Sequence, residues 1–256
     1  MINHEIKGSI STITLDNSRN HNAFSGLLIK DFTNMLEVIN KNEEIRVVVL
    51  RASGQNFSSG ADLNWMKSMV NSSEQVNEKD ALLLAELLDK LNTLSKPTVA
   101  LVQGRTYGGA LGLLACCDIV ISESSAQFCF SEVKLGLIPA TIAPYVIQCI
   151  GSSAATRYFI TAETFDTATA EQLRLVHICC DEGKLADAAE QVIECIQNNG
   201  PQAITAVKQL TQKIDAINPT LKQETAKILA SIRVSPEGQE GIKAFLEKRN
   251  PTWKEQ

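Results

Sequence analysis

Four glycines stand close together between an apolar strand pattern and an apolar helix pattern near the middle of the chain. The strand pattern covers residues 99–102, and the glycines are Gly104, Gly108, Gly109 and Gly112. A turn of this kind presents bare backbone N–H groups, and the dipole of a following helix places partial positive charge beside them. The stretch therefore predicts a site for an anion or for a developing oxyanion. The alternative is a turn whose glycines only allow a strand and a helix to pack closely.

The spacing of these glycines argues against the common nucleotide-binding loops. They follow the pattern G-x-x-x-G-G-x-x-G, whereas the dinucleotide fingerprint requires G-x-G-x-x-G. No Gly-Lys-Ser or Gly-Lys-Thr follows, so the phosphate loop of ATPases does not match either. A nucleotide phosphate is therefore a poor candidate for the anion.

The composition is that of an ordinary globular protein. The 256 residues are 44% hydrophobic and 21% charged, which allows one large core or a core with a small addition. The net charge is −5 and Lys and Arg form no cluster, so we expect no nucleic acid as a partner. No apolar run approaches about 18 residues, so we expect no helix that spans a membrane and no membrane among the partners. The first residues lack the basic and apolar regions of a signal peptide.

The seven cysteines predict free thiols rather than disulfides. Their number is odd, no C-x-x-C occurs, and neighbouring cysteines such as Cys116 and Cys117 or Cys179 and Cys180 rarely bridge each other. Most of the seven lie within apolar runs. We therefore expect buried thiols in a protein of the reducing cytoplasm.

Hydrophobic periodicity predicts repeated strand–helix–strand units over the first part of the chain. Residues 6–15 alternate around Gly8 as a short hairpin, and residues 24–39 follow helical spacing, with Ser25 as the cap. Further predictions are strands at 47–50, 98–102 and 119–121, a helix at 80–94, loops at 16–22 and 52–60, and a polar, mobile segment at 69–79. We therefore expect an α/β fold.

Beyond Pro139 the pattern becomes mainly helical. The predicted helices cover residues 140–150, 152–161, 168–175, 184–198, 202–216, 218–232 and 236–247, with a short strand at 176–180. The last helices are amphipathic but too few to bury their apolar faces alone. We therefore expect a core over residues 1–195 and a helical region over 196–256 that packs against the core or against another subunit.

Glu132 is the strongest candidate for a reactive side chain. The histidines are scattered, no G-x-S-x-G occurs and no His or Cys spacing suits a metal, which disfavours a hydrolase triad and a metal site. Glu132 stands instead among Phe128, Phe130 and Val133. In a dry environment its pKa would rise toward that of a general acid or base. The alternative is a glutamate on the solvent side of a loop.

Several motifs together resemble the crotonase superfamily, that of the enoyl-CoA hydratases and isomerases. They lie at residues 57–63, 104–109, 117–119, 128–132 and 135–139, in the order and spacing of that superfamily, and the similarity covers nearly the whole chain. The resemblance implies a crotonase-like spiral of ββα and βαβ units with a C-terminal helical region that mediates homotrimers, often paired as hexamers. It also implies an acyl-CoA substrate and no metal or redox cofactor, since coenzyme A arrives as part of the substrate.

The resemblance assigns the reaction to three residues. The backbone N–H groups of Ala61 and Gly109 would hold the thioester oxyanion, and Glu132 would act as acid and base. The other positions that it places around the substrate are Ala23, Ser59, Gly60, Asp62, Leu63, Trp65, Tyr107, Gly108, Gly112, Ser131 and Lys248.

Some of these positions have more specific expected roles. The backbone of residues 59–63 would contact the adenine of coenzyme A, and Arg19, His21 or Lys248 would bind its phosphates. Trp65 and Met66 would form a wall of the acyl pocket. Asp62 and Asp118 are expected to cap a helix or a turn.

The chain departs from the two-carboxylate pattern of typical hydratases at Gly112, where those enzymes carry a second glutamate. Glu132 would then work alone or recruit another group, which favours an isomerase that moves a proton between C2 and C4. Residues 60–66 instead resemble the branch that hydrates methylglutaconyl-CoA and related thioesters in the breakdown of leucine or acyclic terpenes. The second carboxylate of such a substrate would need a partner such as Arg105 or Tyr107.

Three functions follow from the resemblance. The first is a hydratase for a short, branched or carboxylated enoyl-CoA of the methylglutaconyl kind. The second is a Δ3,Δ2-enoyl-CoA isomerase with Glu132 as its single base. The third is a catalytically weak acyl-CoA-binding protein, although the retention of Glu132 and of both glycine-rich loops argues against it.

Overall fold

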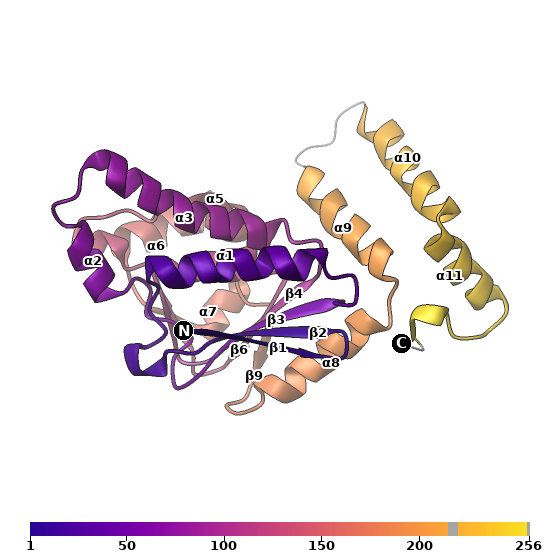
Figure 1. Cartoon of the computed structure of the whole chain (residues 1–256), viewed down its shortest axis with the longest axis horizontal. Coiled ribbons are helices and arrows are strands. Elements are labelled where there is room, and N and C mark those ends of the chain that lie inside the picture. Colours follow the sequence, from indigo (N-terminus) through magenta and orange to yellow (C-terminus); the bar gives the residue numbers. More distant parts are fainter. Residues whose placement is uncertain (215–219, 255–256) are drawn as a thin grey trace.

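A six-stranded sheet lies at the centre of the fold (Figure 1). The computed structural model describes residues 1–214 and 220–254. The strand order is β1-β2-β3-β4-β6-β9. The strands are β1 (Ile2–Lys7), β2 (Ile10–Leu15), β3 (Val47–Ala52), β4 (Thr98–Val102), β6 (Ile119–Glu123) and β9 (Ile178–Cys180). β1 and β2 form the predicted antiparallel hairpin, and the other neighbours are parallel.

Helices cover both faces of this sheet, which explains why β3 is apolar at consecutive positions. Val48 and Leu50 belong to the core that includes apolar residues of α1 (Gly26–Lys41) and α3 (Glu74–Asn92). Val47 and Val49 belong to a second core cluster with residues of α8 (Leu185–Gln197). Figure 1 shows α1 and α3 on one side of the sheet and α8 on the other.

A small second sheet, which the sequence did not predict, divides the glycine-rich turn. Its order is β5-β7-β8, with β5 (Arg105–Tyr107), β7 (Gln127–Cys129) and β8 (Phe165–Asp166). β5 occupies the residues between Gly104 and Gly108, and α4 (Ala110–Cys116) begins after Gly109. Strands this short show too little alternation to be recognised in a sequence.

The helix predicted over residues 80–94 begins earlier than expected, within the polar segment at residues 69–79. α2 (Leu63–Met69) ends at the start of the segment, and α3 begins at Glu74, earlier than the predicted helix over 80–94. Ser73 caps α3, because its hydroxyl accepts a hydrogen bond from Val76 N at 3.4 Å. The first turns of α3 are largely exposed and polar, so they carry no apolar stripe that periodicity could detect.

The second half of the chain follows the predicted order of helices. They are α5 (Ala143–Ile150), α6 (Ser152–Thr161), α7 (Thr167–Gln172), α8, α9 (Pro201–Lys213), α10 (Leu221–Val234) and α11 (Pro236–Leu246). Short 3-10 turns are η1 (Ser18–Asn20), η2 (Glu132–Leu135) and η3 (Thr252–Lys254). In the predicted helices 202–216 and 218–232, residues 215–216 and 218–219 lie outside the described residues, as do residues 255–256 of the expected helical region. Within residues 1–214 and 220–254, none of the helices combines the length and apolar character needed to cross a membrane.

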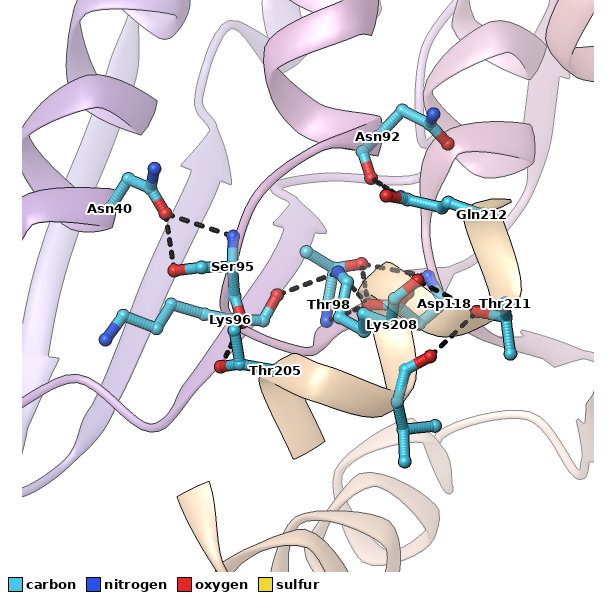
Figure 2. A network of polar contacts seen from close by, with 11 residues as sticks. Asn40, Asn92, Ser95, Lys96, Thr98, Asp118, Thr205, Lys208, Thr211 and Gln212 are labelled. Carbon is cyan, nitrogen blue, oxygen red and sulfur yellow. Dashed lines mark hydrogen bonds and ion pairs between the residues drawn. The ribbon is translucent and has the colours of Figure 1, made fainter. Parts of the chain in front are cut away.

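A partly buried ion pair joins α9 to the sheet (Figure 2). Lys208 Nζ lies 2.5 Å from Asp118 Oδ2 and donates to Lys96 O at 2.9 Å. The same carboxylate accepts hydrogen bonds from Thr98 N at 2.7 Å and Thr98 Oγ1 at 2.9 Å. Asp118 therefore links β4 and β6 to α9, which corrects the expectation that it caps a helix or a turn. α10 and α11 lie on the opposite side of the molecule from α2 (Figure 1).

All seven cysteines are free, but they are not all buried. Cys116, Cys117 and Cys129 lie in the interior, whereas Cys179 and Cys195 are exposed. Cys179 is on β9, the edge strand of the large sheet, which leaves one of its sides uncovered. The expectation of buried thiols is therefore wrong for these two cysteines.

Candidate active site

The two loops rich in small residues lie side by side because their backbones pair. An isolated parallel bridge joins them, in which Tyr107 N donates to Ser58 O at 3.0 Å. Gly60 passes so close to β5 that a Cβ on it would lie 2.9 Å from Tyr107 O, and its φ of +89° also favours glycine. The pairing brings Ala61 from one loop and Gly109 from the other to one cavity.

The segment that carries Glu132 is attached to the glycine-rich turn in a similar way. Gly108 N donates to the carbonyl of Cys129, the last residue of β7, at 2.9 Å. Gly108 has a φ of +55°, and a Cβ on it would lie 3.4 Å from Glu132 Oε1. A glycine at this position therefore lets the carboxyl group approach the turn.

These three segments surround a cavity of about 170 Å³. Ala61, Gly109 and Glu132 all line it, so the structure brings together the residues that the resemblance named for the reaction. The remaining lining is mostly apolar: Phe24, Ile29, Trp65, Leu84, Ile138, Pro139, Ala140, Thr141 and Ile142.

Two backbone N–H groups at this cavity have no acceptor. The neighbours of Ala61 are engaged with Phe24: Phe24 N donates to Gly60 O at 2.7 Å, and Asp62 N donates to Phe24 O at 2.8 Å. Ala61 N and Gly109 N themselves donate to no atom of residues 1–214 and 220–254. Gly109 immediately precedes α4, so its N–H is among the donors that a helix leaves free. The pair can therefore receive an oxygen that carries negative charge.

Glu132 is held where its neutral form is favoured. It is half-buried at the start of η2, and its Oε2 atom is buried without a hydrogen-bond partner in the described part of the chain. Burial raises the pKa of this carboxyl, and a hydrogen bond from its own backbone partly opposes that rise. A raised pKa suits a group that accepts a proton and returns it near neutral pH.

Apolar carbon fills the space beside Gly112, the position of the second glutamate in typical hydratases. A Cβ on Gly112 would lie 2.4 Å from Ile142 Cγ2 and 3.2 Å from Leu88 Cδ2. Both distances are shorter than ordinary carbon contacts, so even an alanine would require these side chains to move. Glu132 is the one acidic side chain among the described residues that line the cavity.

Trp65 lines the cavity as expected, and a carboxylate on α3 holds its ring. Trp65 Nε1 donates to Asp80 Oδ1 at 3.1 Å. Burial raises the pKa of Asp80, whereas the hydrogen bond from the indole lowers it. Met66, its expected companion in the wall, is half-buried and does not line the cavity.

The remaining predicted positions near the loops lie beside the cavity rather than on it. Asp62 caps α2 as expected, since it accepts hydrogen bonds from Trp65 N and Asn64 N, each at 2.9 Å, and these bonds hold its pKa below its usual range. The positions that do not line the cavity are Ala23, Ser59, Gly60, Asp62, Leu63, Tyr107, Gly108, Gly112 and Ser131. Ser59 and Leu63 are exposed, while Ala23, Gly60 and Gly108 are buried.

The expected phosphate-binding residues are spread over the surface. Arg19 and His21 are exposed on the polar loop near the N-terminus, and Lys248 is exposed beyond the end of α11. The helix that Lys248 follows, α11, lies far from α2 (Figure 1). Arg105, one expected partner of a substrate carboxylate, is exposed on β5 and does not line the cavity.

Sequence reasoning missed several residues of the cavity wall. Ile29 and Leu84 come from α1 and α3, where the apolar stripe marked them only as core residues. Thr141 and Ile142 belong to the segment before α5, where the sequence predicts the start of a helix and no part of the site. The proximity of Ile142 to Gly112 results from packing between distant segments, so no local signal could have revealed it.

Known proteins of one family resemble this chain over nearly its whole length. The family model described as "Enoyl-CoA hydratase/isomerase" matches residues 5–256. A crystal structure of an enoyl-CoA hydratase from Shewanella pealeana is similar with a TM-score of 0.96 and 43% identity, over 98% of this chain and 95% of that one. An enoyl-CoA hydratase of Alternaria alternata is 30% identical over 95% of this chain and 80% of its own length.

An isomerase is also among the relatives. A mitochondrial delta(3,5)-delta(2,4)-dienoyl-CoA isomerase of Dictyostelium discoideum is 26% identical over 96% of this chain and 87% of its own length. The chain belongs to the enoyl-CoA hydratase/isomerase family and is an enzyme. The crotonase-like α/β fold expected from the sequence is thereby confirmed.

Proposed function

We propose that this enzyme adds water across the C2–C3 double bond of a short enoyl-CoA. The observation that carries the proposal is a single cavity shared by a half-buried acid, Glu132, and two unpaired N–H groups, those of Ala61 and Gly109. Acyl-thioester chemistry needs this combination, because charge develops on the carbonyl oxygen while a proton moves at the neighbouring carbons.

The proposed reaction divides the work between backbone and side chain. The thioester oxygen lies between the two N–H groups and becomes negative as the oxygen of water bonds to C3. Each donor stabilises that charge in the transition state by about 3 to 4 kcal/mol. Glu132 takes a proton from the attacking water and delivers a proton to C2, so one carboxyl group ends the cycle in the state in which it began.

The cavity favours a short, neutral acyl chain. A closed cavity of about 150 Å³ in another protein holds benzene, so this cavity of about 170 Å³ has room for a few carbons. Among the described residues that line it, none is cationic. A carboxylated chain such as methylglutaconyl would leave its distal charge without a partner, at a high desolvation cost. We therefore place unbranched and branched short enoyl chains ahead of the carboxylated ones.

Isomerisation of a 3-enoyl-CoA is the second candidate, and one observation favours it. With Ile142 and Leu88 against Gly112, the cavity has a single acid, which suffices to move a proton between C2 and C4. The isomerase among the relatives supports the same possibility for this chain.

The ultraviolet absorbance of the conjugated thioester distinguishes these activities. Crotonyl-CoA, 3-methylglutaconyl-CoA and 3-hexenoyl-CoA would each be mixed with the enzyme, and with the Glu132→Gln variant as a control. Hydration removes the absorbance of the first two substrates, while isomerisation of the third creates it. We expect loss of absorbance with crotonyl-CoA at the highest kcat/KM. No change with any substrate would leave only a catalytically weak acyl-CoA-binding protein.

The assembly and the compartment are further parts of the proposal. Large apolar side chains are exposed on the C-terminal helices, including Leu229, Val234, Phe245 and Leu246. Monomeric proteins rarely leave such surfaces open, which supports a homotrimer or a hexamer with these helices at subunit contacts. The seven free thiols support a reducing cytoplasm as the site of action.

A further inference from the structure

The cavity offers few groups that could hold a water molecule beside Glu132. Among its described lining residues, only Glu132, Thr141 and Trp65 have polar side-chain atoms. The indole N–H of Trp65 is already donated to Asp80 at 3.1 Å. The hydroxyl of Thr141 is thus the one polar side-chain group on the wall, apart from the acid, that is not already engaged.

Thr141 has no hydrogen-bond partner within residues 1–214 and 220–254. Thr141 is half-buried, and it lines the same cavity as Glu132. A threonine on a largely apolar wall satisfies its hydroxyl most readily with water or substrate, since a bare buried hydroxyl is costly.

The backbone around Thr141 is held in place by the following helix. Ala143 N donates to Pro139 O at 2.9 Å, and Val146 N donates to Ile142 O at 3.0 Å. Ile142, the next residue, packs against Gly112 and closes the space that a second carboxylate would need. The same segment therefore excludes a second carboxylate that could hold the water and offers the hydroxyl of Thr141 instead.

We propose that Thr141 is a catalytic residue that holds the reacting water opposite Glu132, in place of a second carboxylate. This inference rests on the proposed hydratase activity. The hydroxyl oxygen of Thr141 accepts a hydrogen bond from one proton of the water, which turns a lone pair of the water toward C3.

Hydration then needs only the carboxyl group of Glu132 and the hydroxyl of Thr141. Glu132 removes the other proton of the water as the C3–O bond forms and the C2–C3 π electrons move toward the thioester oxygen. The enolate then collapses, and C2 takes a proton from Glu132. The proton held by Thr141 remains on the new hydroxyl of the product, and Thr141 is unchanged.

The test compares Thr141→Val, which removes the hydroxyl at constant shape, with Thr141→Ser, which keeps it. With crotonyl-CoA, we expect Thr141→Val to lower kcat by about 10- to 100-fold, as for the loss of one hydrogen bond to an ionising group, with KM nearly unchanged. Thr141→Ser should recover most of the rate. Thr164→Val, at an exposed threonine outside this cavity, serves as the matched control and should keep the wild-type rate.

Binding of butyryl-CoA shows whether Thr141 acts on the reacting water or instead supports folding or substrate binding. This saturated thioester cannot be hydrated, so Thr141→Val should bind it as tightly as the wild type does in calorimetry. The role of Thr141 would be overturned if Thr141→Val kept the wild-type kcat. It would also be overturned if the variant lost butyryl-CoA affinity by the same factor as kcat. In either case, hydration by the wild type and its dependence on Glu132 would still stand. If the wild type hydrated no enoyl-CoA, the proposed function and this inference would fail together.

Discussion

At the scale of single residues, Glu132 combines a buried, unpaired Oε2 atom with a raised pKa. We predict that Glu132→Gln lowers kcat by about 10²- to 10⁴-fold, because the amide keeps the shape but transfers no proton. In the wild type, kcat/KM should fall with decreasing pH as the carboxyl takes up a proton, and the midpoint should lie above the ordinary value of 4.5. Steady-state rates from pH 4 to 9 would measure both effects.

The same variant also tests the burial of the carboxyl through stability. Below its ordinary pKa of 4.5, the group is neutral in the folded and the unfolded chain. As pH rises from there to the raised pKa, the unfolded chain loses its proton first, so the wild type loses stability. Glu132→Gln has no such group and should become relatively more stable over that window in urea titrations. A difference between the two proteins that stayed constant with pH would mean that the carboxyl is solvated.

Gly112 and Ile142 make a second prediction at the same scale. Gly112→Ala places a Cβ 2.4 Å from Ile142 Cγ2, so it should cost about 1 to 3 kcal/mol of unfolding free energy despite the helix preference for alanine. An Ile142→Ala background removes the contact with Cγ2 but keeps Ile142 Cβ, which would lie 2.9 Å from the new Cβ, so the same change should cost less there than in the wild type. Urea denaturation of the four proteins in this cycle measures the coupling. Additive effects would show that the two residues do not touch.

The sequence predicted those site residues whose role depends on their immediate neighbours in the chain. Ala61 and Gly109 were assigned through the family resemblance, and the glycines of their two loops agree with that assignment. Glu132 could be predicted because apolar residues surround it in the sequence itself. Thr141 and Ile142 carry no such signal, since Ile142 matters through its packing against Gly112 in a distant helix and Thr141 through its place on the cavity wall.

At the scale of elements, the attachment of α9 to the sheet depends on Lys208. Its side chain is 9% exposed and meets Asp118, which also binds the start of β4 (Figure 2). Lys208→Met should therefore cost about 2 to 4 kcal/mol, because it leaves a partly buried carboxylate without its cation. Lys213→Met, at an exposed position on the same helix, is the control and should change stability by less than about 0.5 kcal/mol. Equal midpoints in urea for the two variants would contradict a structural role for the pair.

Helices and strands were predicted well where they were long and carried their apolar residues on one face. α1 and β2 match their predictions because helical or alternating apolar patterns extend along them, whereas β1 begins at Ile2, before the hairpin predicted over residues 6–15. β5, β7 and β8 were missed, although β5 positions both loops of the cavity. Their pairing is a tertiary interaction between short segments, and the sequence marks only the glycines that permit it.

At the scale of the whole molecule, the division into a core and a helical C-terminal region stays a prediction, but its physical basis can be stated. α9 is fixed to the sheet through Asp118, whereas α10 and α11 lie farther out and expose large apolar side chains (Figure 1). A surface of this kind is stable in water when another subunit covers it. The C-terminal helices are therefore the part of the fold that association is expected to complete.

The last prediction concerns this surface. Phe245 and Leu246 are 82% and 73% exposed in the isolated chain, so a charge at Phe245 should disturb subunit contacts and leave the fold of one chain intact. We predict that the wild type sediments as a trimer or hexamer and that Phe245→Glu shifts it to monomers. Gln191→Glu, which adds the same charge at an exposed position of α8, should not. A monomeric wild type would refute the assembly, and a trimeric Phe245→Glu would place the contacts on another face.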